Sequence, residues 1–278
     1  SEFIRKEHFV GTIYFFDKHV KKHIMKGTKA VNPSNSRVYP NGVSCIREDD
    51  VNMWFYTKEG IAVAFDSGHR DFPGLEKEFR KIGINPKDIK NVFITHVDVD
   101  HAGGVDKNGN NIFPNAQIYI GRDEEQYITG KMHRMTKLGF VKLNVGVSLN
   151  PGYNLLSDGQ IIDVDGVRVE AIHVPGHTLG HMCYLVDDSV LISGDCLAIN
   201  QNGGYPFFDF FTQFPDMNKK SLIKLRDRLK DKPVKAVCTG HSGYRDYDTS
   251  TFAHIDETAI FDRKIHFDES APEDYTKY

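Results

Sequence analysis

Hydrophobic residues in this chain fall into short runs separated by glycine, asparagine and charged residues, a pattern typical of β-strands. The runs predict strands over residues 11–16, 43–47, 53–57, 61–65, 92–94, 160–164, 167–173, 182–186 and 190–192. Lys58, Glu59 and Gly60 separate two of these runs and predict a hairpin turn. A further short apolar run begins at residue 234.

Two stretches follow the helical period instead. Residues 73–82 predict an amphipathic helix that ends at Gly83, and residues 218–229 predict a second helix with a leucine-rich face. Because strands cluster in each half of the chain with helices between them, we expect an α/β fold. Its two β-sheets would pack face to face, with helices on the outer sides. No linker rich in Pro, Gly or Ser divides the chain, so we expect one domain over residues 1–278.

The most informative polar positions directly follow the predicted strand at residues 92–94. His96, Asp98, Asp100 and His101 place four potential metal ligands within six residues. Imidazole and carboxylate groups bind divalent first-row metals, and ligands fixed at a strand end lose little entropy on coordination. The alternative is a polar loop in which His and Asp coincide by chance.

Three later strand ends each add one more side chain of the ligand type. His177 follows a Pro-Gly pair after an apolar strand, Asp195 ends the run at residues 190–192, and His241 ends the run from residue 234. Ligands that come from distant sequence positions and converge in one cleft suit a dinuclear metal site.

The order of these residues resembles the metallo-β-lactamase superfamily. The family pattern is His-x-His-x-Asp-His, then a Gly-His, then an Asp after a strand, then a late His. The resemblance runs over residues 55–243, and the form Gly-His-Thr-Leu-Gly-His at residues 176–181 looks most like the glyoxalase II, lactonase and related hydrolase branches. It implies a four-layer αβ/βα sandwich of two mixed β-sheets flanked by helices, with the site at one edge between the sheets.

The resemblance also implies a role for each candidate residue. The first metal ion would be held by His96, Asp98 and His177, the second by Asp100, His101 and His241, and Asp195 would bridge the two. A hydroxide between the ions would be the nucleophile, and Asp100 would also relay a proton to the leaving group. The expected cofactors are two divalent ions, of Zn, Mn or Fe.

One position departs from the family, because its second His is Asp98 here. A third carboxylate makes hydroxide harder to form and favours harder ions such as Mn²⁺ or Fe²⁺ over Zn²⁺. Several arrangements stay open. Asp98 binds a metal directly, reaches it through water, leaves the first site weakly occupied, or only hydrogen-bonds another ligand while one metal does the chemistry.

Composition narrows the class of partner. The chain of 278 residues is 40% hydrophobic, enough for a substantial core, and its formal net charge of -3 gives no bulk attraction to nucleic acid or an anionic membrane. It has no apolar stretch of about 18 residues and no secretory signal pattern. The four cysteines lack CxxC spacing, which suits a reducing cytoplasm. We therefore expect a cytoplasmic protein that acts on a small molecule.

Two segments, residues 130–152 and 198–215, look inserted. The first has no clear periodicity and carries several basic residues, among them Arg134. The second is aromatic and leaves directly after Asp195; its candidate substrate contacts are Tyr205, Phe207 and Phe208. It either packs on the core or on the partner in a homodimer, or forms a lid that contacts an apolar portion of the substrate.

Two further residues near the candidate ligands have a structural interpretation. Cys196 directly follows Asp195, and in extended backbone their side chains point to opposite sides. We therefore expect Cys196 to pack rather than bind metal, and we expect His181 to be structural as well.

The leading functional hypothesis is metal-dependent hydrolysis of a carboxylic ester, lactone or thioester. Phosphodiester cleavage is an alternative, since some nucleases of the superfamily also resemble His-x-Asp-x-Asp-His. A diiron oxygen-binding or oxygen-reducing protein is another, because such relatives carry a carboxylate at the position of Asp98. Those relatives generally need a flavin domain or another electron donor, which the sequence does not show.

Overall fold

The computed structural model describes residues 31–138, 141–209 and 211–257. The strand predicted over residues 11–16 lies outside these residues. Among the described residues, none of the helices combines the length and the apolar character needed to cross a membrane.

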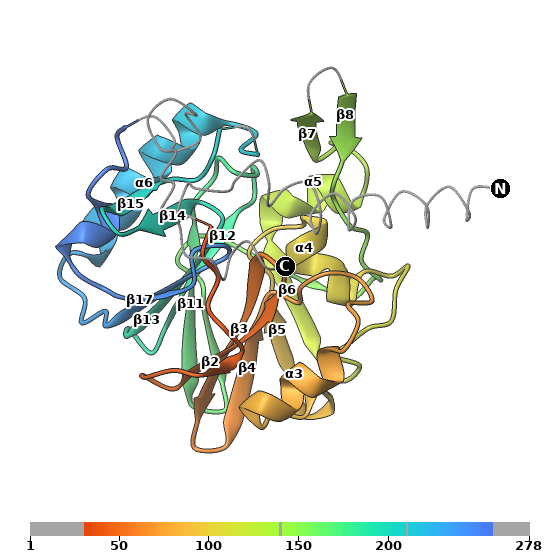
Figure 1. The fold of residues 1–278 in the computed structure, drawn as a ribbon. Coiled ribbons are helices and arrows are strands. Elements are labelled where there is room, and N and C mark those ends of the chain that lie inside the picture. The colour runs from red at the N-terminus through yellow and green to blue at the C-terminus, as the bar shows by residue number, and fades with distance from the viewer. Residues whose placement is uncertain (1–30, 139–140, 210, 258–278) are drawn as a thin grey trace.

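Two mixed β-sheets form the centre of the molecule (Figure 1). The first sheet has seven strands in the order β1 (Arg37–Val38), β2 (Val43–Glu48), β3 (Val51–Lys58), β4 (Ile61–Phe65), β5 (Asn91–Phe93), β6 (Gln117–Gly121) and β9 (Asn154–Leu156). Strands β1 to β4 pair antiparallel, whereas β4, β5, β6 and β9 pair parallel. The parallel strands therefore end at the same edge of the sheet.

The second sheet has six strands in the order β10 (Ile161–Val164), β11 (Val167–His173), β12 (Met182–Val186), β13 (Val190–Gly194), β16 (Ala236–Thr239) and β17 (Tyr244–Asp246). Its pairs are antiparallel except β13 with β16, which is parallel. Two separate hairpins complete the strands: β7 (Met135–Leu138) with β8 (Val141–Asn144), and β14 (Leu197–Asn200) with β15 (Gly203–Pro206).

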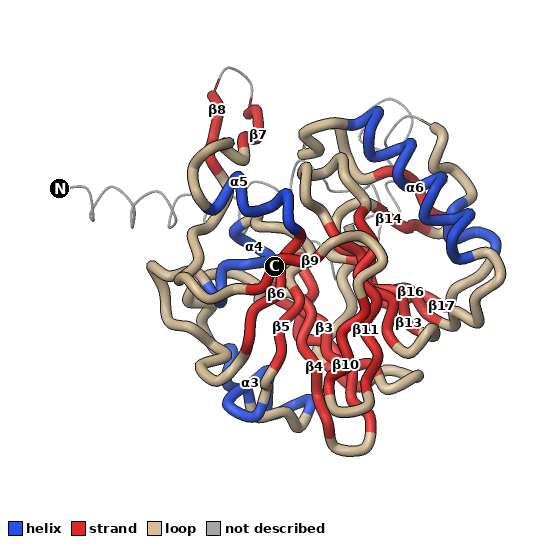
Figure 2. The backbone as a smooth tube through the Cα atoms, turned by 180° about the vertical axis from the view of Figure 1, so that it is seen from behind, coloured by secondary structure: helices blue, strands red, loops and turns tan. Residues whose placement is uncertain are grey.

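The α-helices of the described residues are α3 (Leu75–Ile82), α4 (Val99–Ala102), α5 (Glu125–Ile128) and α6 (Pro215–Leu229). One hydrophobic cluster lies between the sheets and contains side chains of both, such as Phe93 and Tyr184. Helix α3 buries Phe79 on the outer side of the first sheet, and α6 buries Leu222 on the outer side of the second. Figure 2 shows these helices on opposite sides of the paired sheets. The four-layer αβ/βα sandwich predicted from the sequence is confirmed.

The predicted elements agree with the structure in most places. The hairpin turn at residues 58–60 uses Glu59 and Gly60 at φ 51° and 83°, and Gly83 ends α3 at φ 69°, where a glycine costs least. Helix α6 begins at Pro215, three residues before the predicted start, because proline fits the first helical turn. Among the strands that the sequence pattern did not predict are β6, β9 and β17, which are only three to five residues long.

Hydrogen bonds between the sheets align the strand ends that carry the candidate ligands. The Tyr184 hydroxyl of β12 donates to the Ile94 carbonyl oxygen at 2.7 Å, and the Trp54 indole of β3 donates to the Thr239 carbonyl at 3.0 Å. The Met182 amide also donates to the Thr95 carbonyl at 2.9 Å. The ends of β5 and β16 and the start of β12 are therefore held at one edge between the sheets.

A cluster of ion pairs joins α6 to β11 on the outer side of the second sheet. The buried carboxylate of Glu170 accepts hydrogen bonds from Arg228 at 2.8 Å, Lys232 at 3.1 Å and Arg168 at 3.2 Å. Burial opposes ionisation of Glu170, but Lys232 and Arg228 hold the pKa of its carboxyl below the usual value. The cluster stabilises the contact between helix and sheet while the carboxylate is ionised.

Candidate metal centre

The loop after β5 carries the first four candidate ligands into the edge between the sheets. His96 lies just beyond the strand, Asp98 directly precedes α4, and Asp100 and His101 lie within that helix; all four are buried. The structure brings His177, Asp195 and His241 to the same place from the β11–β12 loop and the ends of β13 and β16. All seven predicted ligand residues therefore converge, in overlapping groups whose potential ligand atoms lie within 4.8 Å of one another.

Asp100, His101 and His241 form one of these groups, the second subsite of the sequence analysis. The His241 Nε2 atom lies 3.5 Å from an Asp100 carboxylate oxygen and 3.1 Å from Asp195 Oδ2. The His101 Nε2 atom lies 3.4 Å from Asp195 Oδ1. Gly240 permits this close approach, because a Cβ atom there would collide with Asp195 Oδ1. Asp195 thus lies beside both imidazoles, as a ligand shared between them would.

The Nδ1 atom of each imidazole in this subsite lies within hydrogen-bond distance of an acceptor. His101 Nδ1 lies 2.8 Å from Asp66 Oδ2, and His241 Nδ1 lies 2.6 Å from the Asp50 carbonyl oxygen. Neither partner can donate, so both imidazoles carry a proton on Nδ1 and direct Nε2 inward. Burial opposes protonation of His101, yet Asp195, Asp100 and Asp66 hold its pKa well above the usual value, so a metal ion that binds there displaces the Nε2 proton. Within the described structure, His101 Nε2 and Asp195 Oδ1 are buried and have no hydrogen-bond partner. A divalent ion fits this donor set.

His96, Asp98 and His177 form the first subsite, but a further residue lies within it. The buried Arg134 guanidinium donates from Nε to Asp98 Oδ1 at 2.7 Å and from Nη2 to Asp98 Oδ2 at 2.9 Å. The same Nη2 lies 3.1 Å from His177 Nε2. Sequence reasoning noted Arg134 only as one basic residue of the 130–152 segment. Asp98 therefore hydrogen-bonds an arginine here, and its role as a ligand stays a prediction.

Burial and neighbouring charges set the protonation of these groups. Burial opposes ionisation of Asp98, yet Arg134 and His96 hold its pKa well below the usual range. Burial likewise opposes ionisation of Asp195, and the imidazoles of His241 and His101 hold its pKa well below the usual range. Burial, with a contribution from His96, lowers the pKa of His177 to about 3. The carboxylates are therefore ionised and His177 is neutral near pH 7, as metal ligands must be.

Glu124 links two of the loops that carry candidate ligands. No sequence motif predicted this role. Its Oε2 atom accepts the Val97 amide at 3.0 Å, and its Oε1 atom accepts the Gly180 amide at 3.0 Å and the Thr178 hydroxyl. The side chain is fully buried, and burial raises its pKa to about 7. Glu124 thereby links the loop of His96 and Asp98 to the loop of His177.

The three candidate substrate contacts lie at different distances from this centre. The Phe207 ring packs edge-on against His177 and face-on against His241, with centroid separations of 5.3 and 5.5 Å. Phe208 packs behind Phe207, and Tyr205 stacks on His254. All three are buried in one cluster around β15. Contact with substrate stays a prediction, and Phe207 is the one of the three that borders the ligands.

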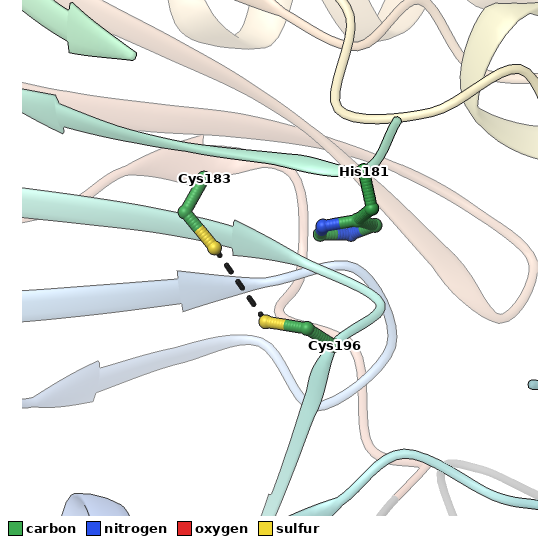
Figure 3. A group of neighbouring side chains, drawn as sticks. All are labelled: His181, Cys183 and Cys196. Atoms are coloured by element: carbon green, nitrogen blue, oxygen red, sulfur yellow. Dashed lines mark hydrogen bonds between the residues drawn. The ribbon is translucent and has the colours of Figure 1, made fainter. Parts of the chain in front are cut away.

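Figure 3 shows a third group of potential ligands, His181, Cys183 and Cys196. The Asp195 amide donates to His181 Nε2 at 3.1 Å, and both thiols donate to the Ser193 carbonyl oxygen, 3.5 Å apart from each other. Burial raises the pKa of Cys196 well above its usual value, whereas metal binding needs a thiolate. The contacts favour the predicted packing role for Cys196 and a structural role for His181.

Comparison with known proteins agrees with this geometry. The family model of the metallo-beta-lactamase superfamily matches residues 46–241, most of the chain. The chain belongs to this superfamily. A metallo-beta-lactamase of subclass B3 described as having an active-site glutamic acid shares the fold, with a TM-score of 0.59 at 14% identity over 84% of this chain and 90% of that one. The resemblance inferred from the ligand order is thus confirmed.

Curated relatives of this superfamily match at low identity. An N-acyl homoserine lactonase from a Bacillus species is 27% identical over 58% of this chain, and a hydroxyacylglutathione hydrolase from Xylella fastidiosa is 27% identical over 76%. The chain spans 59% and 66% of the length of these two proteins, and 34% of a lactamase-like protein of Aspergillus niger. The chain therefore combines membership in this superfamily with groups of candidate metal-binding residues.

Proposed function

We propose that the chain is a metal-dependent hydrolase that cleaves a carboxylic ester, lactone or thioester. The observation that carries this proposal is the second subsite. There His101 and His241, each oriented through Nδ1, turn their Nε2 atoms toward the carboxylates of Asp100 and Asp195. A divalent ion held there would supply Lewis-acid chemistry, since it would lower the pKa of a coordinated water and polarise a carbonyl oxygen. The names of the relatives, a lactonase and a hydroxyacylglutathione hydrolase, support acyl substrates.

Other residues around the subsite have roles in attracting the cation, transferring a proton and binding the acyl group. Asp195 is held ionised between the two imidazoles, so its carboxylate attracts a cation to the subsite. Asp100 lies on the same subsite and is the candidate to take up a proton and pass it to the leaving group. Phe207 presents a hydrophobic ring beside His177 and His241, which favours an acyl chain over a charged phosphodiester. The diiron alternative needs Asp98 as an iron ligand, and both Asp98 oxygens accept from Arg134.

A substrate panel tests the proposal. The full chain would be stripped with a chelator, reloaded separately with Zn²⁺, Mn²⁺ or Fe²⁺, and assayed with an acyl lactone, an acyl thioester, an aryl ester and an aryl phosphodiester. We expect turnover of the acyl substrates and loss of that turnover in His241→Ala. Metal affinity should fall at least ~10-fold in the same variant, because one of few ligands is removed.

The matched control is His254→Ala, which removes an imidazole that stacks on Tyr205 and belongs to none of the groups of candidate ligands among the described residues. It should retain both activity and metal. Turnover of the phosphodiester alone would replace the proposed substrate class. Full acyl turnover in His241→Ala would remove that residue from the site, and oxygen consumption by the iron-loaded protein without acyl turnover would favour the diiron alternative.

A further inference from the structure

We propose that the Arg134 guanidinium takes the place of the first metal ion, so that the chain binds a single divalent ion at the subsite of Asp100, His101, His241 and Asp195. This inference rests on the proposed function, because it assumes that the centre binds metal. It concerns how many ions bind and which residues hold them.

Arg134 contacts two of the three side chains that would hold a metal in the first subsite, Asp98 and His177, whereas His96 Nε2 is buried without a hydrogen-bond partner among the described residues. Asp98 Oδ2 and His177 Nε2 lie 3.3 Å apart, and Arg134 Nη2 lies 2.9 Å from the first and 3.1 Å from the second. The other Asp98 oxygen accepts from Arg134 Nε, so the pair is bidentate. The two Nη2 hydrogens point to Asp98 Oδ2 and the Phe211 carbonyl, so His177 Nε2 either shares one of them or donates to Asp98. Both arrangements engage the nitrogen that would coordinate an ion.

The charges of the centre balance with one divalent ion. Asp98, Asp100 and Asp195 contribute three negative charges, and one divalent ion with one guanidinium contributes three positive charges. A second divalent ion would leave the buried centre with two excess positive charges and would lie against the guanidinium. Arginine cannot relieve this repulsion by losing its proton, as a lysine could.

The fold holds Arg134 in this place. The Val145 amide donates to the Arg134 carbonyl at 2.9 Å, beside the hairpin of β7 and β8. The segment that follows pairs with the ligand loop itself, since the Val99 amide donates to Val145 and the Val147 amide donates to Val97. The side chain is anchored from a third direction, because Nη2 donates to the Phe211 carbonyl at 2.7 Å. Arg134 is therefore built into the centre and is 1% exposed.

The two subsites also differ in how their imidazoles are supported. His101 and His241 direct Nδ1 at a carboxylate and a backbone carbonyl, whereas the Nδ1 atoms of His96 and His177 meet the hydroxyls of threonines, at 2.9 and 3.5 Å. The Thr95 hydroxyl donates to the Asp66 carboxylate, so it accepts from His96 Nδ1, whereas the contact of His177 with Thr212 is at the upper limit of hydrogen-bond length. At the second subsite both outer acceptors are of the carboxylate or backbone carbonyl kind that most directly orients metal-binding histidines.

Metal counting tests the inference without measuring activity. Wild type, His177→Ala and Arg134→Met would each be loaded with Co²⁺, dialysed against buffer, and analysed for bound cobalt by mass spectrometry and for the visible spectrum of the ion. We expect one ion in wild type and one in His177→Ala, with a Kd change well below the ~10-fold that loss of a ligand would cause. Arg134→Met should bind a second ion, because Asp98 and His177 are then released.

The possible outcomes separate the two proposals. Two ions in wild type and one in His177→Ala would show that the arginine does not replace the metal, and the inference would fail while the proposed function stood. No bound ion in wild type would overturn the proposed function itself. Since Arg134→Met leaves Asp98 buried without its partner and is at risk of unfolding, circular dichroism would check its fold. The comparison of wild type with His177→Ala decides the count even if that variant fails.

Discussion

The carboxylate of Asp66 allows the second subsite to be tested through the orientation of one ligand. Asp66 Oδ1 accepts the Thr95 amide at 2.7 Å, and Oδ2 lies 2.8 Å from His101 Nδ1. In Asp66→Asn, the side-chain carbonyl oxygen of the asparagine would still accept the Thr95 amide. The side-chain NH₂ group would then face His101 Nδ1. Two donors cannot share a hydrogen bond, so the imidazole must move its proton to Nε2 or turn away. Both responses withdraw the lone pair from the metal.

The expected loss of metal affinity is ~10- to 100-fold, the usual effect of removing such an outer contact, which is about 1.4–2.7 kcal/mol of binding free energy. A competition titration of apo protein and Zn²⁺ against a chromophoric chelator measures the Kd. Asp88→Asn, at an exposed aspartate, is the matched control and should bind as wild type does. Thermal melting of the apo variants would separate a loss of fold from a loss of affinity. A folded Asp66→Asn protein that binds Zn²⁺ as tightly as Asp88→Asn would refute this reasoning.

Two further predictions concern stability and are measured by urea unfolding of the metal-free protein. Glu124→Gln should lower the unfolding free energy by about 1–3 kcal/mol, because the Gln side chain in either orientation leaves the backbone N–H of Val97 or of Gly180 without an acceptor. Asp123→Asn, at the exposed neighbouring residue, is the control. Equal stability of the two variants would contradict the prediction. Glu170→Gln should lower the unfolding free energy by about 1 kcal/mol at pH 7. The pKa of Glu170 is lower in the folded protein than its ordinary value near 4.5, so its contribution to stability is present above pH 4.5 and is lost as the pH falls through the folded pKa. If the stability difference between wild type and Glu170→Gln stayed constant down to pH 3, that result would count against the ion-pair cluster.

The sequence predicted the fold where local pattern and global packing agree. Strands β2 to β4 and β10 to β13 have apolar runs bounded by turn residues, so their positions follow from the chain itself. The ligand residues were found for a related reason, since each follows a strand end or stands in a motif of fixed spacing. Strands such as β9 are too short for periodicity to reveal, and their pairing is set by contacts with strands far away in the chain.

The same limit explains why Glu124 and Arg134 were not recognised as part of the centre. Glu124 was indistinguishable from any acidic residue at a helix start, because its partners Val97 and Gly180 come from other loops. Arg134 reaches the centre only because residues near 145 pair both with it and with the ligand loop. That pairing depends on tertiary contacts, and residues 130–152 have no periodicity from which it could be read.

The replacement of the family's histidine by Asp98 has a different electrostatic effect when Arg134 is taken into account. Taken alone, a third carboxylate would reduce the positive charge of a two-metal centre and favour harder ions. In the structure the guanidinium neutralises that carboxylate, so the charges facing the second subsite are those of Asp100 and Asp195, the two ligand carboxylates that the family pattern retains. The loss of a histidine at position 98 and the arginine at position 134 thus act as one compensated change. The preference for harder ions expected from Asp98 loses its electrostatic basis, and the remaining donors of the second subsite, two imidazoles with two carboxylates, suit Zn²⁺ as well as Mn²⁺ or Fe²⁺.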